Sequence, residues 1–93
     1  MPRLTDADVT ARLDGIAWER DGDTIVREVR CKDFEAAIGL VNRVAEIAES
    51  ANHHPDILVH GYNHVRLTLS THSEGGLTAA DFALAGQLDA LIG

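Results

Sequence analysis

The chain is poor in cysteine, in basic residues and in long apolar runs. It has one cysteine, Cys31, which excludes an intrachain disulfide and a cysteine-rich metal site. Eight basic residues against fifteen acidic ones give a formal charge of -7, the wrong sign for a protein that binds nucleic acid directly. No apolar run approaches the roughly 18 residues that cross a bilayer, and the start of the sequence lacks the apolar segment of an export signal. We therefore expect a cytoplasmic protein that does not contact a membrane.

The remaining composition is that of an ordinary globular domain. Apolar residues make up 45% and charged residues 25%, which argues against disorder. A length of 93 residues leaves room for one core, so we expect a single domain over residues 1–93. Because so small a core gives little net stability, we also expect a homodimer or homotetramer, with sheet edges paired in the dimer.

The first third of the sequence predicts a helix followed by a β-hairpin. Thr5 and Asp8 have the spacing of a capping pair, and the helix should run to about Leu13. Residues 16–20 and 24–29 are rich in β-branched side chains and flank an Asp-Gly pair that suits a tight turn. These two runs predict antiparallel strands.

A long helix follows, and its periodicity is the strongest structural signal in the chain. Asp33 can cap it, and its apolar residues recur every three or four positions, so that they line one face. These residues are Phe34, Ala37, Ile38, Val41, Val44, Ala45 and Ala48. The helix should end near Asn52, since Asn tolerates the left-handed conformation and Pro55 disfavours a helical residue before it.

A second hairpin is predicted over residues 57–62 and 65–71. Apolar and polar residues alternate along the second of these strands, which indicates one buried face. Asn63 and His64 are the expected turn.

A glycine-containing loop leads to the last helix, capped by Thr78 with Asp81 and running to about Leu91. The predicted order is therefore α-β-β-α-β-β-α. Because both strand pairs are hairpins, we expect an α+β fold, a two-layer sandwich of a four-stranded antiparallel sheet with three helices on one face.

Five histidines stand out in this plain sequence. His53 and His54 follow the end of the long helix, where unpaired carbonyls carry partial negative charge. Histidine titrates close to neutral pH, which suits a general acid or base. Glu49 lies one turn earlier and could orient His53, although a helix-capping role for either histidine stays open.

The other histidines carry different expectations. His72 ends the fourth predicted strand, from where its side chain can reach over the sheet rim toward the first two. His60, in a predicted strand, and His64, in a predicted turn, are interpreted as structural or solvated. Asp81 needs no catalytic role, because helix capping already explains an acid at that position.

Three histidines and a carboxylate also raise the possibility of zinc. Zinc ligands on a helix usually lie one turn apart, however, which the adjacent His53 and His54 do not. We therefore favour a metal-free site for proton transfer.

The sequence resembles the pterin-4a-carbinolamine dehydratase family. The shared residues occur in order and at the family spacing: Glu49, His53-His54-Pro55, Tyr62, Ser70-Thr71-His72, Gly75-Gly76-Leu77-Thr78 and Asp81. A weaker resemblance extends over about residues 4–91. Val29 and Cys31 depart from it, since relatives commonly carry aromatic residues in this strand.

The resemblance implies the loss of water from a 4a-hydroxytetrahydropterin to give the quinonoid dihydropterin, without a cofactor or metal. It implies that His53 and His72 transfer the protons and that His54 chiefly holds the pterin ring. Glu49, Pro55 and Thr71 are the further substrate-binding residues expected. An aromatic amino acid hydroxylase would be a pathway partner. Some relatives are instead non-catalytic dimerisation or assembly modules, which is the alternative.

Overall fold

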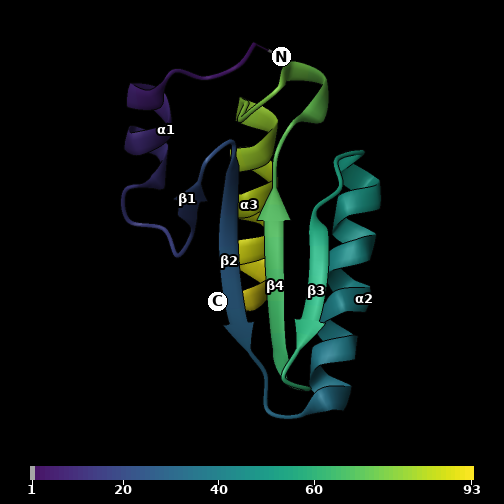
Figure 1. Cartoon of the computed structure of the whole chain (residues 1–93). Coiled ribbons are helices and arrows are strands. Elements are labelled where there is room, and N and C mark those ends of the chain that lie inside the picture. Colours follow the sequence, from purple (N-terminus) through teal and green to yellow (C-terminus); the bar gives the residue numbers. More distant parts are fainter. Residues whose placement is uncertain (1) are drawn as a thin grey trace.

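The computed structural model describes residues 2–93. It shows a four-stranded antiparallel sheet with helices packed against it (Figure 1). The elements are α1 (Asp6–Leu13), β1 (Glu19–Asp21), β2 (Thr24–Arg30), α2 (Phe34–Ala51), β3 (Asp56–His60), β4 (His64–Leu69), the 3-10 helix η1 (His72–Glu74) and α3 (Ala79–Ile92). The strands lie in the order β1-β2-β4-β3. This confirms the predicted α+β class and the predicted order of elements.

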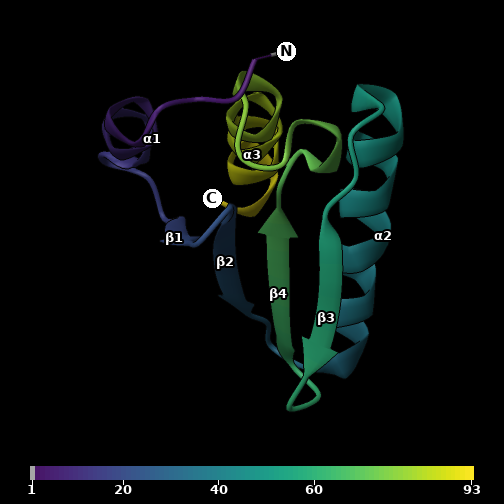
Figure 2. The ribbon, with the colours of Figure 1, turned by 45° about the horizontal axis from the view of Figure 1, so that its top comes forward.

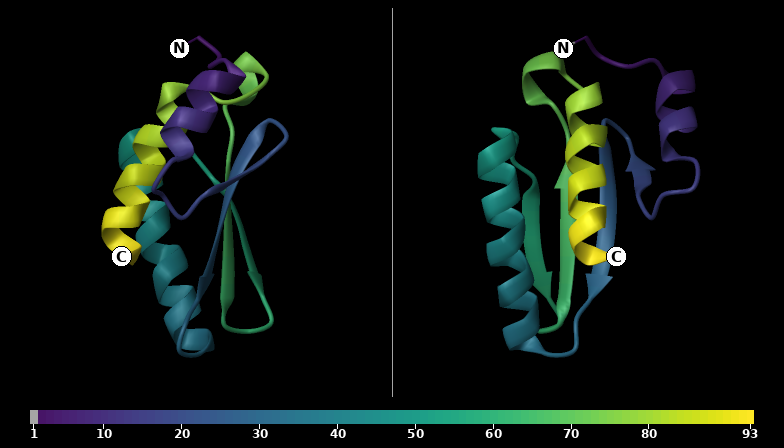
Figure 3. Two further views of the ribbon diagram at one scale, coloured as in Figure 1. Left: turned by 90° about the vertical axis from the view of Figure 1, so that its left-hand side faces the viewer. Right: turned by 180° about the vertical axis from the view of Figure 1, so that it is seen from behind.

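Two layers are visible when the sheet is seen edge-on. Helices α2 and α3 cover one face, and α1 lies on the same side beyond β1, while the other face of the sheet is open (Figure 3). The alternation predicted for β4 is confirmed, because Val65, Leu67 and Leu69 are fully buried against the helices. Leu84 and Leu88 of α3 complete the centre of the core. No helix within residues 2–93 is both long and apolar enough to cross a membrane.

Helix α2 begins and ends where the sequence predicts. The Asp33 carboxylate accepts a hydrogen bond from the Ala36 backbone N–H at 2.8 Å, which caps the first turn. At the other end Asn52 takes the left-handed conformation with φ of 51°, and its N–H donates to the carbonyls of Ala48 and Glu49. Local residue choice therefore sets both boundaries.

The buried face of α2 was predicted only in part. Ala37, Val44 and Ala48 are buried as expected, together with Leu40. Phe34 and Ile38, in contrast, are 55% and 38% exposed. The helix is apolar on more than one side, so periodicity alone could not select the face that packs against the sheet.

Strand boundaries in both hairpins also differ from the prediction, and the second hairpin has Asp56–His60 and His64–Leu69 in place of residues 57–62 and 65–71. The first strand is Glu19–Asp21 rather than residues 16–20. In the second hairpin the turn lies at residues 61–63, and His64 is the first residue of β4. Gly61 and Tyr62 both have positive φ, and Asn63 is tied to Cys31 by a backbone bond and by its side chain. These contacts with a distant residue move the turn away from the predicted Asn63-His64.

Candidate active site

The three histidines that the sequence singled out line one cleft. It has a volume of about 230 Å³ and lies between the end of α2 and the connection from β4 to α3. Figures 1 and 2 show these two segments side by side at one end of the sheet. The lining residues are Asn52, His53, His54, Ser70, Thr71, His72 and Ser73. The structure thus brings together side chains that are about twenty residues apart in the sequence.

The end of α2 positions the first two histidines. The left-handed Asn52 turns the chain out of the helix, and the His53 N–H donates to the Ala48 carbonyl at 3.2 Å. The chain is therefore held on both sides of the turn, and the two adjacent imidazoles contact different carboxylates, those of Asp81 and Glu49.

His53 is held by a buried carboxylate. Its Nε2 donates to Asp81 Oδ1 at 2.6 Å, and Asp81 is fully buried. The other Asp81 oxygen accepts hydrogen bonds from Thr71 Oγ1 at 2.8 Å and from the Thr78 backbone N–H at 2.9 Å. An ionised carboxylate only accepts hydrogen bonds, so it keeps the proton of His53 on Nε2 and leaves Nδ1 for a ligand.

Asp81 is the residue whose role the sequence analysis underestimated. The capping box with Thr78 exists as predicted, since the Asp81 carboxylate accepts from the Thr78 backbone. The interpretation that capping explains it fully was wrong, because its second oxygen binds His53. Asp81 was among the residues that carry the family resemblance, and this was the available signal.

Glu49 interacts with a different histidine from the one expected. Its Oε1 accepts from His54 Nε2 at 2.8 Å, whereas His53 is bonded to Asp81. The prediction that Glu49 orients His53 was therefore wrong. The pair is open to solvent, with side-chain exposures of 56% for His54 and 78% for Glu49, so it contributes little to stability.

His72 approaches from the other side of the cleft. It is the first residue of η1 and not the last residue of a strand, because β4 ends at Leu69. With His54 it also lines a small adjoining hollow of about 30 Å³ on the open face of the sheet. These two imidazoles thus border the same space.

The other predicted substrate-binding residues differ in where they lie relative to the cleft. Thr71 lines the cleft, but its hydroxyl is bonded to Asp81 and to Thr78 Oγ1, the latter at 2.9 Å. Glu49 and Pro55 are not part of the lining, and Glu49 reaches it only through His54.

Two larger hollows lie elsewhere on the described part of the chain. One of about 310 Å³ lies beside β1, around Trp18 and Val26, and one of about 430 Å³ lies beside the start of α2, around Asp33 and Gly39. Neither is lined by a histidine, the side chain most often used for proton transfer, so the smaller cleft with three of them is the better candidate.

These observations define a class of protein. It is an α+β sandwich with a cleft lined by histidines, one of which is held by a buried aspartate. The family model described as pterin 4 alpha carbinolamine dehydratase matches residues 2–91. A relative from Thermomicrobium roseum is 52% identical over 89 residues, or 95% of each chain, and one from Chloroflexus aurantiacus is 48% identical over the whole of both chains. Both carry the name pterin-4-alpha-carbinolamine dehydratase as a provisional assignment.

Solved structures agree with this. The crystal structure of a transcriptional coactivator/pterin dehydratase from Brucella melitensis has a TM-score of 0.90 at 35% identity, covering 98% of this chain and 99% of that one. A pterin dehydratase-like RuBisCO assembly factor of the alpha-carboxysome, 23% identical with a TM-score of 0.70, shares the fold. The chain belongs to the pterin-4a-carbinolamine dehydratase family.

Proposed function

We propose that the protein removes water from a 4a-hydroxytetrahydropterin and releases the quinonoid dihydropterin, by metal-free acid–base catalysis. The observation that carries the proposal is the meeting of three imidazoles at one cleft, with one of them held by the buried Asp81. Family membership supplies the substrate class.

The reaction needs two proton transfers and no change of oxidation state. The C4a–oxygen bond breaks as the leaving hydroxyl receives a proton and departs as water. N5 loses its proton while its lone pair forms the C=N bond to C4a. One group that donates a proton and one that accepts it are therefore sufficient, and imidazoles can do both near neutral pH.

His53 and His72 are the proposed proton carriers, on opposite sides of the cleft. In His53 the Nε2–H is bonded to Asp81, which leaves Nδ1 to exchange a proton with the substrate. A carboxylate behind an imidazole fixes its orientation and stabilises the imidazolium that forms when Nδ1 takes up a proton. Asp81 is thus a positioning residue that acts through His53.

The exposed pair of His54 and Glu49 suits ring binding better than proton transfer. Glu49 Oε1 accepts from His54 Nε2 and so orients an imidazole that can contact the flat pterin. The Thr71 hydroxyl donates to Asp81, so this residue supports the site through that carboxylate. Pro55 would act only by fixing the direction of the chain after His54.

Substitution of the proton carriers tests the proposal. His53→Ala and His72→Ala should each lose a substantial part of a rate enhancement of about 10²- to 10⁴-fold, the range typical of general acid–base catalysis. The measurement is the dehydration rate of a 4a-hydroxytetrahydropterin, compared with its spontaneous rate. Wild-type rates in both single variants and in the double variant would contradict the assignment, and would favour a non-catalytic dimerisation or assembly module.

The finer biological setting belongs to the same proposal. A homodimer or homotetramer is supported by the outer strands β1 and β3 and by the exposed Phe34 and Ile38 on α2. Solution mass measurement tests this, and a monomer at high concentration would contradict it. Function in the cytoplasm, after an aromatic amino acid hydroxylase, is the expected context.

A further inference from the structure

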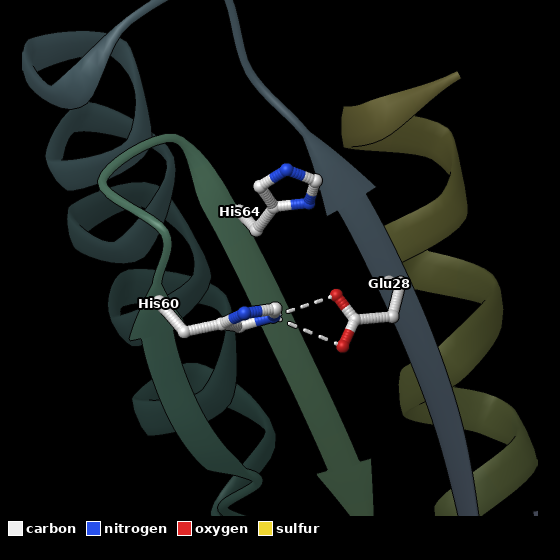
Figure 4. A group of neighbouring side chains, drawn as sticks. All are labelled: Glu28, His60 and His64. Carbon is white, nitrogen blue, oxygen red and sulfur yellow. Dashed lines mark hydrogen bonds and ion pairs between the residues drawn. The ribbon is translucent and has the colours of Figure 1, made fainter.

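The open face of the sheet carries a second group of histidines. Glu28 on β2, His60 on β3 and His64 on β4 project from the face opposite the helices (Figure 4). One nitrogen or oxygen atom from each lies within 4.8 Å of the others. His60 and Glu28 have side-chain exposures of 37% and 42%, so the group is open to ions in solution.

Strand register fixes this arrangement. His60 is directly opposite His64 in the β3–β4 pair, and their ring centroids are 5.2 Å apart. On the other side of β4, Glu28 pairs with Arg66, two residues after His64, so Glu28 is the diagonal neighbour of His64. Three adjacent strands therefore hold the three side chains, which do not depend on a flexible loop.

The carboxylate is already turned toward one imidazole. His60 Nε2 lies 3.0 Å and 3.1 Å from the two oxygens of Glu28. One imidazole nitrogen and two carboxylate oxygens thus already face one another, from two different strands.

We propose that Glu28, His60 and His64 form a binding site for a divalent transition-metal ion such as Zn²⁺. Two imidazoles and one carboxylate are a common zinc ligand set, which leaves a fourth position for water. Imidazole nitrogen favours zinc, copper or nickel over Mg²⁺ and Ca²⁺, which prefer oxygen ligands.

The geometry requires only a small adjustment. Bonds of about 2.0–2.1 Å at tetrahedral angles place ligand atoms about 3.3 Å apart. His60 Nε2 and the Glu28 oxygens are already near that separation. A ring nitrogen of His64 lies within 4.8 Å of the ligand atoms of both other residues. A movement of the His64 side chain toward the other two ligands would bring its nitrogen to that separation.

Two arginines on the same face limit the affinity. Arg66 Nε donates to Glu28 Oε1 at 2.6 Å, and Arg30 is the register partner of His64. Arg66 occupies one carboxylate oxygen and leaves Oε2 for the ion. Its positive charge should weaken metal binding without preventing it.

This site is separate from the candidate active site. His60 ends β3 and His64 begins β4, whereas the catalytic cleft lies at the start of β3 and beyond the end of β4. The two sites are about 20 Å apart along β4, from the usual rise per residue of a strand. Metal bound here would bridge three strands and stabilise the sheet, and the proposed dehydration does not require it.

Calorimetric titration with Zn²⁺ tests the site, using chelator-treated protein without a histidine tag. We expect one ion per chain. The His60→Ala/His64→Ala variant should bind at least about 100-fold more weakly, beyond the effect of removing an outer partner. Glu28→Gln keeps the side-chain shape and should also weaken binding at least about 10-fold. Arg66→Gln should strengthen it.

The matched control removes the other histidines. A His53→Ala/His54→Ala/His72→Ala variant should keep wild-type zinc affinity, and Zn²⁺ should raise its unfolding temperature as it does for the wild type. The proposal is overturned if zinc does not bind, or if binding is lost in this triple variant and kept in His60→Ala/His64→Ala. The latter variant should dehydrate the pterin at the wild-type rate, so failure of this proposal is distinguishable from failure of the proposed function.

Discussion

Replacing Asp81 by Asn is the substitution that most directly probes the candidate site. The Asn side chain has the same shape but one acceptor and one donor in place of two acceptors. The Thr78 N–H and the Thr71 hydroxyl both donate to Oδ2, so the amide oxygen should stay there. The new NH₂ group then faces His53 Nε2, which must accept a hydrogen bond from it.

The consequence is a change of tautomer in His53. With Nε2 as acceptor, the ring proton of neutral His53 moves to Nδ1, the nitrogen proposed to exchange a proton with the substrate, and the imidazolium form of His53 loses its carboxylate partner. We expect kcat to fall about 10²- to 10⁴-fold, with KM little changed because Asp81 is fully buried and is not part of the cleft lining. Weakening a charge-assisted hydrogen bond should also lower the free energy of unfolding by about 1.5–3 kcal/mol.

The assay must separate catalysis from stability, and α3 offers a matched control. Asp89 lies two turns after Asp81 and accepts hydrogen bonds from Trp18 Nε1 and Arg27 Nη1, away from the cleft. Asp89→Asn should lower the unfolding temperature while leaving the dehydration rate unchanged. Both variants are assayed well below their unfolding temperatures, against the spontaneous dehydration rate. A folded Asp81→Asn protein with kcat within about two-fold of the wild type would refute the role given to this carboxylate.

Two further substitutions test what positions the site. Asn52→Ala should lower the free energy of unfolding by about 1–2 kcal/mol, because Ala disfavours the left-handed conformation, and should reduce the dehydration rate by displacing His53. Asn52→Gly should keep the wild-type stability and the wild-type rate, because glycine adopts this conformation readily. Equal stability of the two variants would contradict this. Leu67→Ala should lower the free energy of unfolding by about 2–5 kcal/mol in urea denaturation, because the side chain is fully buried under the helices, and a loss below about 1 kcal/mol would argue against this packing.

Features that depend on neighbours in the sequence were predictable. The Asp33 cap and the left-handed end at Asn52 are where their residue types indicate, since capping involves atoms a few residues apart. The alternation in β4 was equally readable. The turn after β3 was not, because Asn63 is held by Cys31, which is distant in the sequence.

In the candidate site, too, the residue types were predictable from the sequence, but the individual hydrogen bonds between them were not. Composition and spacing indicated histidine chemistry at residues 53, 54 and 72. They did not show that Asp81 is hydrogen-bonded to His53 and that Glu49 is hydrogen-bonded to His54. A carboxylate at the third position of a helix has a sufficient local explanation, so its second partner is visible only in three dimensions.

The helices and strands of this protein and their order follow from local propensity, capping and periodicity, and the histidines available for proton transfer can be read directly from the sequence. Three further features become visible only in the folded chain: the pairing of β2 with β4, the buried face of α2, and the carboxylate that each imidazole contacts. The same pairing brings Glu28 to His60 and His64 on the open face. Pairing of strands and docking of helices bury apolar surface between segments remote in the chain, and no pattern within one segment specifies its partner.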